Sequence, residues 1–242
     1  MPRPPRDDYR GAIHHVFVRG NARFPIAVED ADFDRGLFLL EQTKTRFELV
    51  CHAWCLLPNH AHFLVTSQLG NLSRAMHWLG TCSAQSFNRR HARSGHLYQG
   101  RFGSRLVEDD EYFLELTRYL PLNPVRAGLC QSPGDWQWSS YAATAGLRRA
   151  PWFLDPSTCI QLLGSTGAYV DWVARGVDPA VLDEDGLHQP PQPPLLPALL
   201  AEASVDAIIR AQSFGYSLAA IADHLGVSRR TISRRLAAHS GV

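Results

Sequence analysis

Apolar and polar residues follow one another in a regular order along the first half of the chain, and this order predicts strands and helices in turn. Residues 12–19 alternate well enough for a strand. Residues 30–47 place apolar side chains at helical spacing. Residues 48–57 are apolar on both faces, as in a central strand, and a tight corner at 58–59 returns the chain as an antiparallel strand from residue 60. The pattern therefore predicts helices combined with an antiparallel sheet.

Two further helices are predicted after these strands. Asn71 or Ser73 can cap the first of them, and an apolar stripe runs along it that we expect to face the core. The stripe consists of Leu72, Ala75, Met76, Leu79 and Phe87. The second helix begins near Asp109, and the acidic residues Asp110 and Glu111 suit the positive end of its dipole.

The remaining chain predicts an extension, a linker and a second domain. Residues 147–177 read as two or three short helices packed back on the main domain, residues 1–146. Residues 178–197 are too rich in proline for a helix or a central strand, which indicates a linker. Residues 198–242 then resemble a small helical DNA-binding module.

Within that module, residues 217–236 have the pattern of a helix-turn-helix. The first helix has an apolar face, Gly226 lies in the turn, and Ser228 caps the second helix. The second helix carries four arginines and no acidic residue. The candidates for base or phosphate contacts are Arg229, Arg230, Thr231, Ser233, Arg234 and Arg235. A helical hairpin used for protein contacts would show a similar pattern.

The composition indicates a globular protein of a reducing compartment. The chain has 242 residues, of which 45% are hydrophobic and 10% aromatic, so it can bury a sizeable core. Its net charge of +1 supplies no bulk attraction to nucleic acid, and any such attraction must come from local clusters. The five cysteines are scattered, and neither a signal peptide nor an apolar membrane span is evident. We expect a cytoplasmic protein, associated with the nucleoid when bound to DNA, and no membrane partner.

The candidate chemistry begins with His60 and His62. In a strand, residues i and i+2 point the same way, so the two imidazoles would stand side by side as a metal-ligand pair. Such a pair leaves coordination positions open for substrate, as in catalytic sites. The same two residues would also fit one solvent-facing histidine and one hydrogen-bonded histidine of the sheet.

A basic stretch lies between residues 86 and 105. It contains arginines interleaved with aromatic residues and no acidic residue, a combination that suits single-stranded nucleic acid. The members that we take as candidate DNA contacts, together with Arg19, are Arg89, Arg90, Arg101, Phe102 and Arg105. The alternative is a solvated basic face beside a core strand.

The sequence resembles a known family, the HUH single-tyrosine transposases, and within it the REP-associated tyrosine transposases. The matching segments, which span roughly residues 9–146, are FVRGN (17–21), CLLPNHAHFLV (55–65), GHLYQGRFGSRLV (95–107), RYLPLNPVRAGL (118–129) and WQWSSYAA (136–143). The resemblance implies a ferredoxin-like α+β domain. Its central antiparallel sheet would carry the two histidines, and a helix would carry a tyrosine nucleophile.

Carried over to this chain, the resemblance makes His60 and His62 metal ligands, Tyr119 the nucleophile and Asn123 an additional amide ligand. Tyr119 and Asn123 fall on one helix face, which they share with Tyr112, the competing tyrosine. Without the resemblance, they would pass for a core tyrosine and a capping asparagine. Pro121 lies between them and removes a backbone donor, which is a departure from a regular helix.

The implied activity is nicking and strand transfer of single-stranded DNA that carries hairpins, through a 5′-phosphotyrosine, with Mg²⁺ or Mn²⁺ as the ion. A phenol with a pKa of about 10 is a weak nucleophile until its phenolate is favoured. The helix-turn-helix would add duplex binding. Two alternatives are a DNA-binding regulator of repeated genomic hairpins and a metal-dependent hydrolase of another substrate. The pattern leaves open whether the protein is a monomer or a homodimer.

Overall fold

The structure is a computed structural model that describes residues 7–176, 200, 202–213 and 218–239. The chain divides into two compact units, Met1–Pro190 and Pro191–Val242, which are described separately below. The predicted linker, residues 178–197, lies outside the described residues. None of the helices in the described ranges combines the length and the hydropathy of a membrane span.

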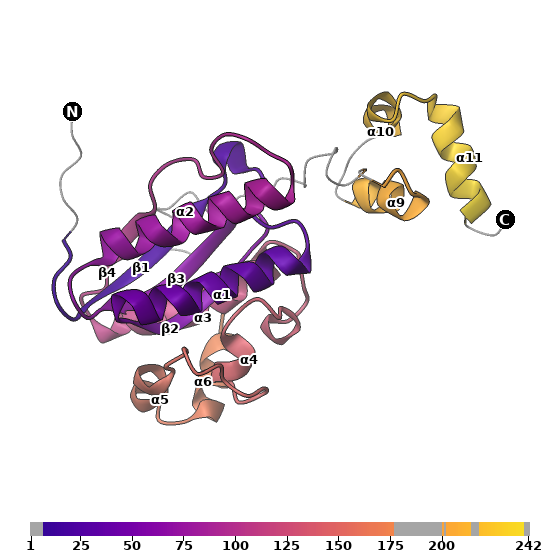
Figure 1. The fold of residues 1–242 in the computed structure, drawn as a ribbon. Coiled ribbons are helices and arrows are strands. Elements are labelled where there is room, and N and C mark those ends of the chain that lie inside the picture. The colour runs from indigo at the N-terminus through magenta and orange to yellow at the C-terminus, as the bar shows by residue number, and fades with distance from the viewer. Residues whose placement is uncertain (1–6, 177–199, 201, 214–217, 240–242) are drawn as a thin grey trace. The chain divides into compact units, whose positions relative to one another are not determined.

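The first unit is built on a four-stranded antiparallel sheet with the strand order β2-β3-β1-β4 (Figure 1). The elements that form it are, in chain order, β1 (Ala12–Arg19), α1 (Asp30–Phe47), β2 (Leu49–Leu56), β3 (His60–Ser67), α2 (Leu72–Arg90) and β4 (Gly103–Leu106). A βαββαβ order with this sheet topology is the ferredoxin-like arrangement, so the predicted fold class is confirmed. A further long helix, α3 (Asp110–Arg126), follows β4.

The helix ends show why these segments fold locally. A capping box of Glu29 and Asp32 begins α1, and Glu48 in the left-handed conformation ends it. Helix α3 begins next to Asp109, as predicted, and the Asp109 side chain caps it by accepting the backbone N–H of Tyr112 at 2.6 Å. The start of α2 differs from the prediction. Asn71 is the N-cap residue but makes no side-chain cap bond, and a carboxylate distant in sequence, Asp8, accepts the N–H of Leu72 at 2.7 Å.

The two faces of the sheet are covered by different helices (Figure 1). Helices α1 and α2 pack on one face, where Ala61, Phe63 and Val65 of β3 enter the core. Helix α3 packs on the other face, where Leu64 contributes to a second core cluster. Because side chains alternate along a strand, His60 and His62 point to the face that α3 covers. The site therefore lies between the sheet and α3.

Shorter helices complete the first unit. They are α4 (Tyr141–Thr144), α5 (Ser157–Leu163) and α6 (Thr166–Ala174), with 3-10 turns at Asn21–Arg23 and Pro133–Asp135. Cys159, Tyr169 and Val173 from α5 and α6 belong to the same core cluster as the inner face of α3. Asp155 donates its backbone N–H to the carbonyl of Cys51 at 2.8 Å, and Ser140 donates to that of Trp54 at 3.0 Å. These bonds cover the outer edge of β2.

The second unit contains α9 (Val205–Ser213), α10 (Leu218–His224) and α11 (Arg229–His239). Their buried side chains form one small core, made of Leu200, Ala207, Ile208, Ala211, Ile221, Ala222 and Ile232. Gly226 has a φ of +63° in the turn between α10 and α11, a conformation that favours glycine. Ser228 Oγ accepts the N–H of Thr231 at 3.2 Å and so caps α11, as predicted.

Candidate active site

The two histidines of β3 form the centre of the candidate site. His60 is 5% exposed and His62 is 0% exposed, and their ring centroids lie 5.1 Å apart. The Nδ1 atom of His60 lies 2.7 Å from Oδ1 of Asn59. An amide oxygen can only accept, so His60 Nδ1 carries the proton and its Nε2 presents the lone pair. This is the form in which a neutral histidine binds a metal through Nε2.

A third histidine, His15 of β1, contacts the ring of His62. Its Nε2 lies 3.0 Å from Nδ1 of His62, and the two rings are stacked with centroids 5.2 Å apart. Burial lowers the pKa of His15 to about 3, with a contribution from Arg105, so His15 is neutral near pH 7. A neutral His15 can accept the Nδ1 proton of His62, which leaves Nε2 of His62 in the same ligand form as that of His60.

The sequence prediction missed His15. The alternation of residues 12–19 already places His15 on one strand face with Phe17 and Arg19. The register of β1 against β3, which pairs Phe17 with His62 and Arg19 with His60, is what brings that face to the metal-ligand pair. No local pattern in the sequence encodes this register.

Tyr119 reaches the same cluster from α3. Its side chain is 0% exposed, and its ring stands edge-on to His62 at 5.5 Å and to His15 at 6.0 Å between centroids. Tyr112 lies seven residues earlier on α3, and the contact that fixes its backbone is the cap made by Asp109. The structure thus brings Tyr119 together with His60 and His62.

Asn123 lies one turn after Tyr119 and is also buried. Its Nδ2 donates a hydrogen bond to the backbone carbonyl of Tyr119 at 2.9 Å. Because Nδ2 of Asn123 bonds within its own helix, Oδ1 is the atom that can serve in the predicted ligand role. Helix α3 continues through Pro121 from Asp110 to Arg126.

The strand beside the site, β4, has a glycine at position 103 that leaves room for a neighbouring ring. Gly103 of β4 pairs with Phe17 of β1, and a Cβ added to Gly103 would lie 2.1 Å from Cε2 of Phe17. The ring of Phe17 therefore lies directly over β4, with its centroid 6.4 Å from that of His62. Because the ring occupies that space, a side chain at position 103 would force the Phe17 ring to move.

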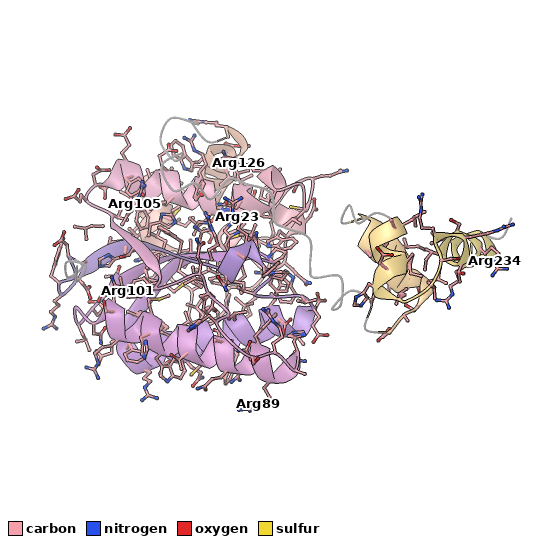
Figure 2. The ribbon with its side chains drawn as sticks, turned by 90° about the horizontal axis from the view of Figure 1, so that it is seen from above. Arg23, Arg89, Arg101, Arg105, Arg126 and Arg234 are labelled. Atoms are coloured by element: carbon pink, nitrogen blue, oxygen red, sulfur yellow. The ribbon has the colours of Figure 1, made fainter. Side chains whose placement is uncertain are left out.

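The predicted DNA contacts of the first unit separate into two groups. Arg19 pairs with His60 across β1 and β3, and Arg105 pairs with His15 across β1 and β4, so both lie at the histidine face. Figure 2 shows Arg105 toward the α3 side of the sheet, and Arg89 beyond α2 on the opposite side. The sequence prediction did not separate Arg89 from Arg105, because it grouped the residues of 86–105 by their closeness in sequence.

Two of these predicted contacts, Phe102 and Arg90, have partners within the first unit. Phe102 is half-buried and packs against the core cluster beneath α1 and α2. Arg101, just before it, is exposed. The guanidinium of Arg90 lies 3.2 Å from Oε1 of Glu29 and 3.4 Å from Oδ1 of Asp32.

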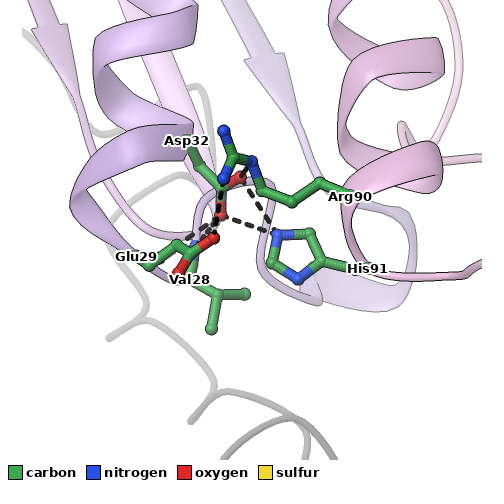
Figure 3. Close-up of polar contacts among 5 residues, drawn as sticks. All are labelled: Val28, Glu29, Asp32, Arg90 and His91. Atoms are coloured by element: carbon green, nitrogen blue, oxygen red, sulfur yellow. Dashed lines mark hydrogen bonds and ion pairs between the residues drawn. The ribbon is translucent and has the colours of Figure 1, made fainter.

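Arg90 is part of a polar cluster that joins the start of α1 to the end of α2 (Figure 3). His91 Nε2 lies 2.9 Å from Asp32 Oδ2, which also accepts the backbone N–H of Val28. Glu29, Asp32 and His91 place ligand atoms within 4.8 Å of one another, so the group could hold a cation. Arg90 already neutralises these carboxylates, and we interpret the cluster as a clamp between two helices.

In the second unit, α11 presents a basic surface. Arg229, Arg230, Ser233 and Arg234 are exposed, as is Arg235; Figure 2 shows Arg234 on this helix. Thr231 is half-buried and its hydroxyl lies 2.9 Å from that of Ser228, so it belongs to the cap of the helix.

Comparison with known proteins shows which family this chain resembles. Residues 9–121 match the family of IS200-like transposases. A Haemophilus influenzae protein, provisionally named a REP-associated tyrosine transposase, is 28% identical over 112 residues, which cover 42% of this chain and 64% of that protein. The chain therefore matches less than two thirds of that relative's length.

One solved structure supports the fold. A structure described as a REP-associated tyrosine transposase bound to a REP hairpin aligns with a TM-score of 0.52 and 19% identity, over 65% of this chain and 94% of that one. A provisionally named transposase from Deinococcus radiodurans aligns with a TM-score of 0.36 and 15% identity, over 49% of this chain and 95% of that one. Over residues 9–121, which make up less than half of the chain, the protein is similar to the IS200-like transposases.

Proposed function

We propose that this protein nicks single-stranded DNA and transfers the strand through a 5′-phosphotyrosine on Tyr119, with a divalent metal held by His60 and His62. The observation that carries the proposal is the edge-on contact of Tyr119 with His62, at 5.5 Å, inside a buried histidine cluster. The match of residues 9–121 to the IS200-like transposases and the name of the Haemophilus influenzae relative support it.

The histidines fit a divalent ion. The Nδ1 atoms of His60 and His62 are held by Asn59 and His15, so each Nε2 is the ligand nitrogen. A bound Mg²⁺ or Mn²⁺ would supply positive charge beside the scissile phosphate. Asn123 Oδ1 is the candidate for a third protein ligand.

The chain's own residues account for the remaining chemistry. Oη of Tyr119 loses its proton and bonds to phosphorus, the bond from phosphorus to the 3′ oxygen breaks, and that oxygen takes up a proton. The products are a 5′-phosphotyrosyl link and a 3′-hydroxyl. Attack by another 3′-hydroxyl reverses the step and joins strands without ATP.

Burial of Tyr119 sets a condition on substrate access. With Tyr119 at 0% exposure, a phosphodiester reaches Oη only after α3 or its neighbours move. Arg19 and Arg105, at the edge of the same sheet face, are placed to bind phosphates of the incoming strand. A related structure contains a REP hairpin, which makes a hairpin-bearing strand the first substrate to test.

We further propose that the exposed arginines of α11 bind duplex DNA, with Arg229, Arg230 and Arg234 on phosphates or base edges. This activity would be separate from cleavage. Deletion of residues 198–242 should therefore weaken duplex binding and leave cleavage of a supplied single strand intact. Loss of cleavage as well, in a truncated protein that is still folded, would contradict this division.

The main test is adduct formation. The protein is incubated with Mn²⁺ and labelled single-stranded oligonucleotides that carry hairpins, and adducts are detected on denaturing gels and located by mass spectrometry. We expect an adduct on Tyr119 that is absent in Tyr119→Phe and His60→Ala. Tyr112→Phe is the matched control on the same helix and should still form it. An adduct on Tyr112, or an unchanged adduct in Tyr119→Phe, would overturn the assignment.

The complete burial of Tyr119 is the observation that favours a second function, a regulator that binds hairpins without cleaving them. In that case the oligonucleotides would bind tightly and no adduct would form with either metal.

A further inference from the structure

Helix α3 carries an internal defect beside its tyrosine. In an α-helix the N–H of residue i bonds to the carbonyl of residue i−4. Pro121 has no N–H, so the carbonyl of Thr117 loses its partner within the helix. Thr117 and Pro121 lie on either side of Tyr119 in sequence, so the missing bond spans the residue that we propose as the nucleophile.

A side chain from α6 supplies the missing donor. The hydroxyl of Tyr169 donates to the carbonyl oxygen of Thr117 at 3.2 Å, in a buried environment. The Tyr169 side chain is 2% exposed and belongs to the same core cluster as Tyr119. Burial raises the pKa of Tyr169 well above its usual 10.0, so its hydroxyl keeps the proton that it donates.

A second residue of α6 contacts the preceding turn of α3. Nε1 of Trp172 donates to the carbonyl of Leu114 at 3.0 Å. The guanidinium of Arg118, which pairs with Glu115, lies 4.1 Å from the centroid of the Trp172 ring. Helix α6 therefore contacts the carbonyls of Leu114 and Thr117 and the guanidinium of Arg118, all of which precede Tyr119 on α3.

We propose that α6 is a brace for the proline-interrupted helix, and that Tyr169 is a positioning residue for Tyr119. The hydroxyl of Tyr169 takes the place of the N–H that Pro121 lacks. Without this bond, a buried carbonyl would be left unsatisfied and α3 would bend at Pro121, which would shift the Tyr119 ring relative to His62. This assigns a role to α6, Thr166–Ala174.

The brace itself is tested without DNA, on the full chain, by a double-mutant cycle. Tyr169→Phe keeps the ring and removes the donor, and we expect it to raise the unfolding equilibrium constant about tenfold. Pro121→Ala restores a backbone N–H for Thr117, so Tyr169→Phe should cost much less in that background. Equal losses in both backgrounds would overturn the brace.

A matched control is available in the same cluster. The Tyr141 ring is tilted against that of Tyr169, with centroids 5.7 Å apart, and its hydroxyl makes no hydrogen bond to α3 among the described residues. Tyr141→Phe should show no coupling to Pro121→Ala. Hydrogen exchange of the α3 amides provides a second readout, with faster exchange expected in Tyr169→Phe and recovery in the double variant. Coupling of the same size in Tyr141→Phe would mean that the cycle reports general packing, and would count against the brace.

The positioning role rests on the proposed function and is tested by the rate of adduct formation. At saturating oligonucleotide, Tyr169→Phe should form the adduct about tenfold more slowly, with an unchanged half-saturating concentration, and Pro121→Ala should restore the rate. A coupled stability cycle without a change in rate would overturn the positioning role. Absence of any adduct in the unmodified protein would instead reject the proposed function, and the stability cycle would still decide the brace.

Discussion

Replacement of His15 by leucine tests whether this buried histidine prepares His62 for metal binding. The substitution removes the Nε2 acceptor that lies 3.0 Å from Nδ1 of His62, in a cluster where both rings are 0% exposed. A buried donor left without its acceptor costs about 1–3 kcal/mol. Loss of a hydrogen-bond partner behind a metal ligand lowers metal affinity about 10–100-fold. The two magnitudes agree, because about 1.4 kcal/mol corresponds to a factor of ten.

The assay is calorimetric titration of the full-length protein with Mn²⁺ in the absence of DNA. His15→Gln is the conservative control, because a glutamine carbonyl can still accept from His62, and it should keep most of the affinity. His14→Gln controls for damage to β1, since His14 is the adjacent residue and contacts Asp8 at 3.2 Å instead of the site. A folded His15→Leu protein that binds Mn²⁺ as tightly as the unmodified chain would refute the reasoning.

Three further predictions concern the sheet, a buried histidine and the second unit. Gly103→Ala should lower the free energy of unfolding by about 1–3 kcal/mol, because the new Cβ would overlap Phe17. Adding Phe17→Leu to this variant should recover much of the lost stability. An unchanged melting temperature in Gly103→Ala would show that the ring moves aside at no cost. Burial lowers the pKa of His52 below 6.5, so the unfolded chain binds the proton more readily than the folded chain. The contribution of His52 to stability should therefore be complete above about pH 6.5 and decrease as the pH falls below that value, and stability should fall less steeply in His52→Gln. Identical acid denaturation of both proteins would exclude this contribution. Arg234→Ala should reduce the salt dependence of duplex binding, measured by fluorescence anisotropy, by about one unit of slope, whereas an unchanged slope would remove Arg234 from the phosphate contacts.

Local patterns in the sequence determined much of the fold and of the candidate site. The alternation of residues 12–19 and the helical stripe of α2 predicted elements close to those observed. The placement of His60 and His62 on one strand face follows from a period of two that neighbouring residues alone define. Asp109 predicted the start of α3, because a cap depends on residues within one turn. Strand β4 was not predicted, since its four residues, GSRL, hold one large apolar side chain.

The tertiary structure decided which of these residues meet. His15 contacts His62 across 47 positions of the chain, and Tyr169 contacts Thr117 across 52. Arg90, predicted as a DNA contact, pairs with Glu29 at the start of α1. These contacts depend on strand register and on the packing of helices against the sheet. A short-range pattern specifies which way a side chain points, but the partner that it meets is set by elements elsewhere in the sequence.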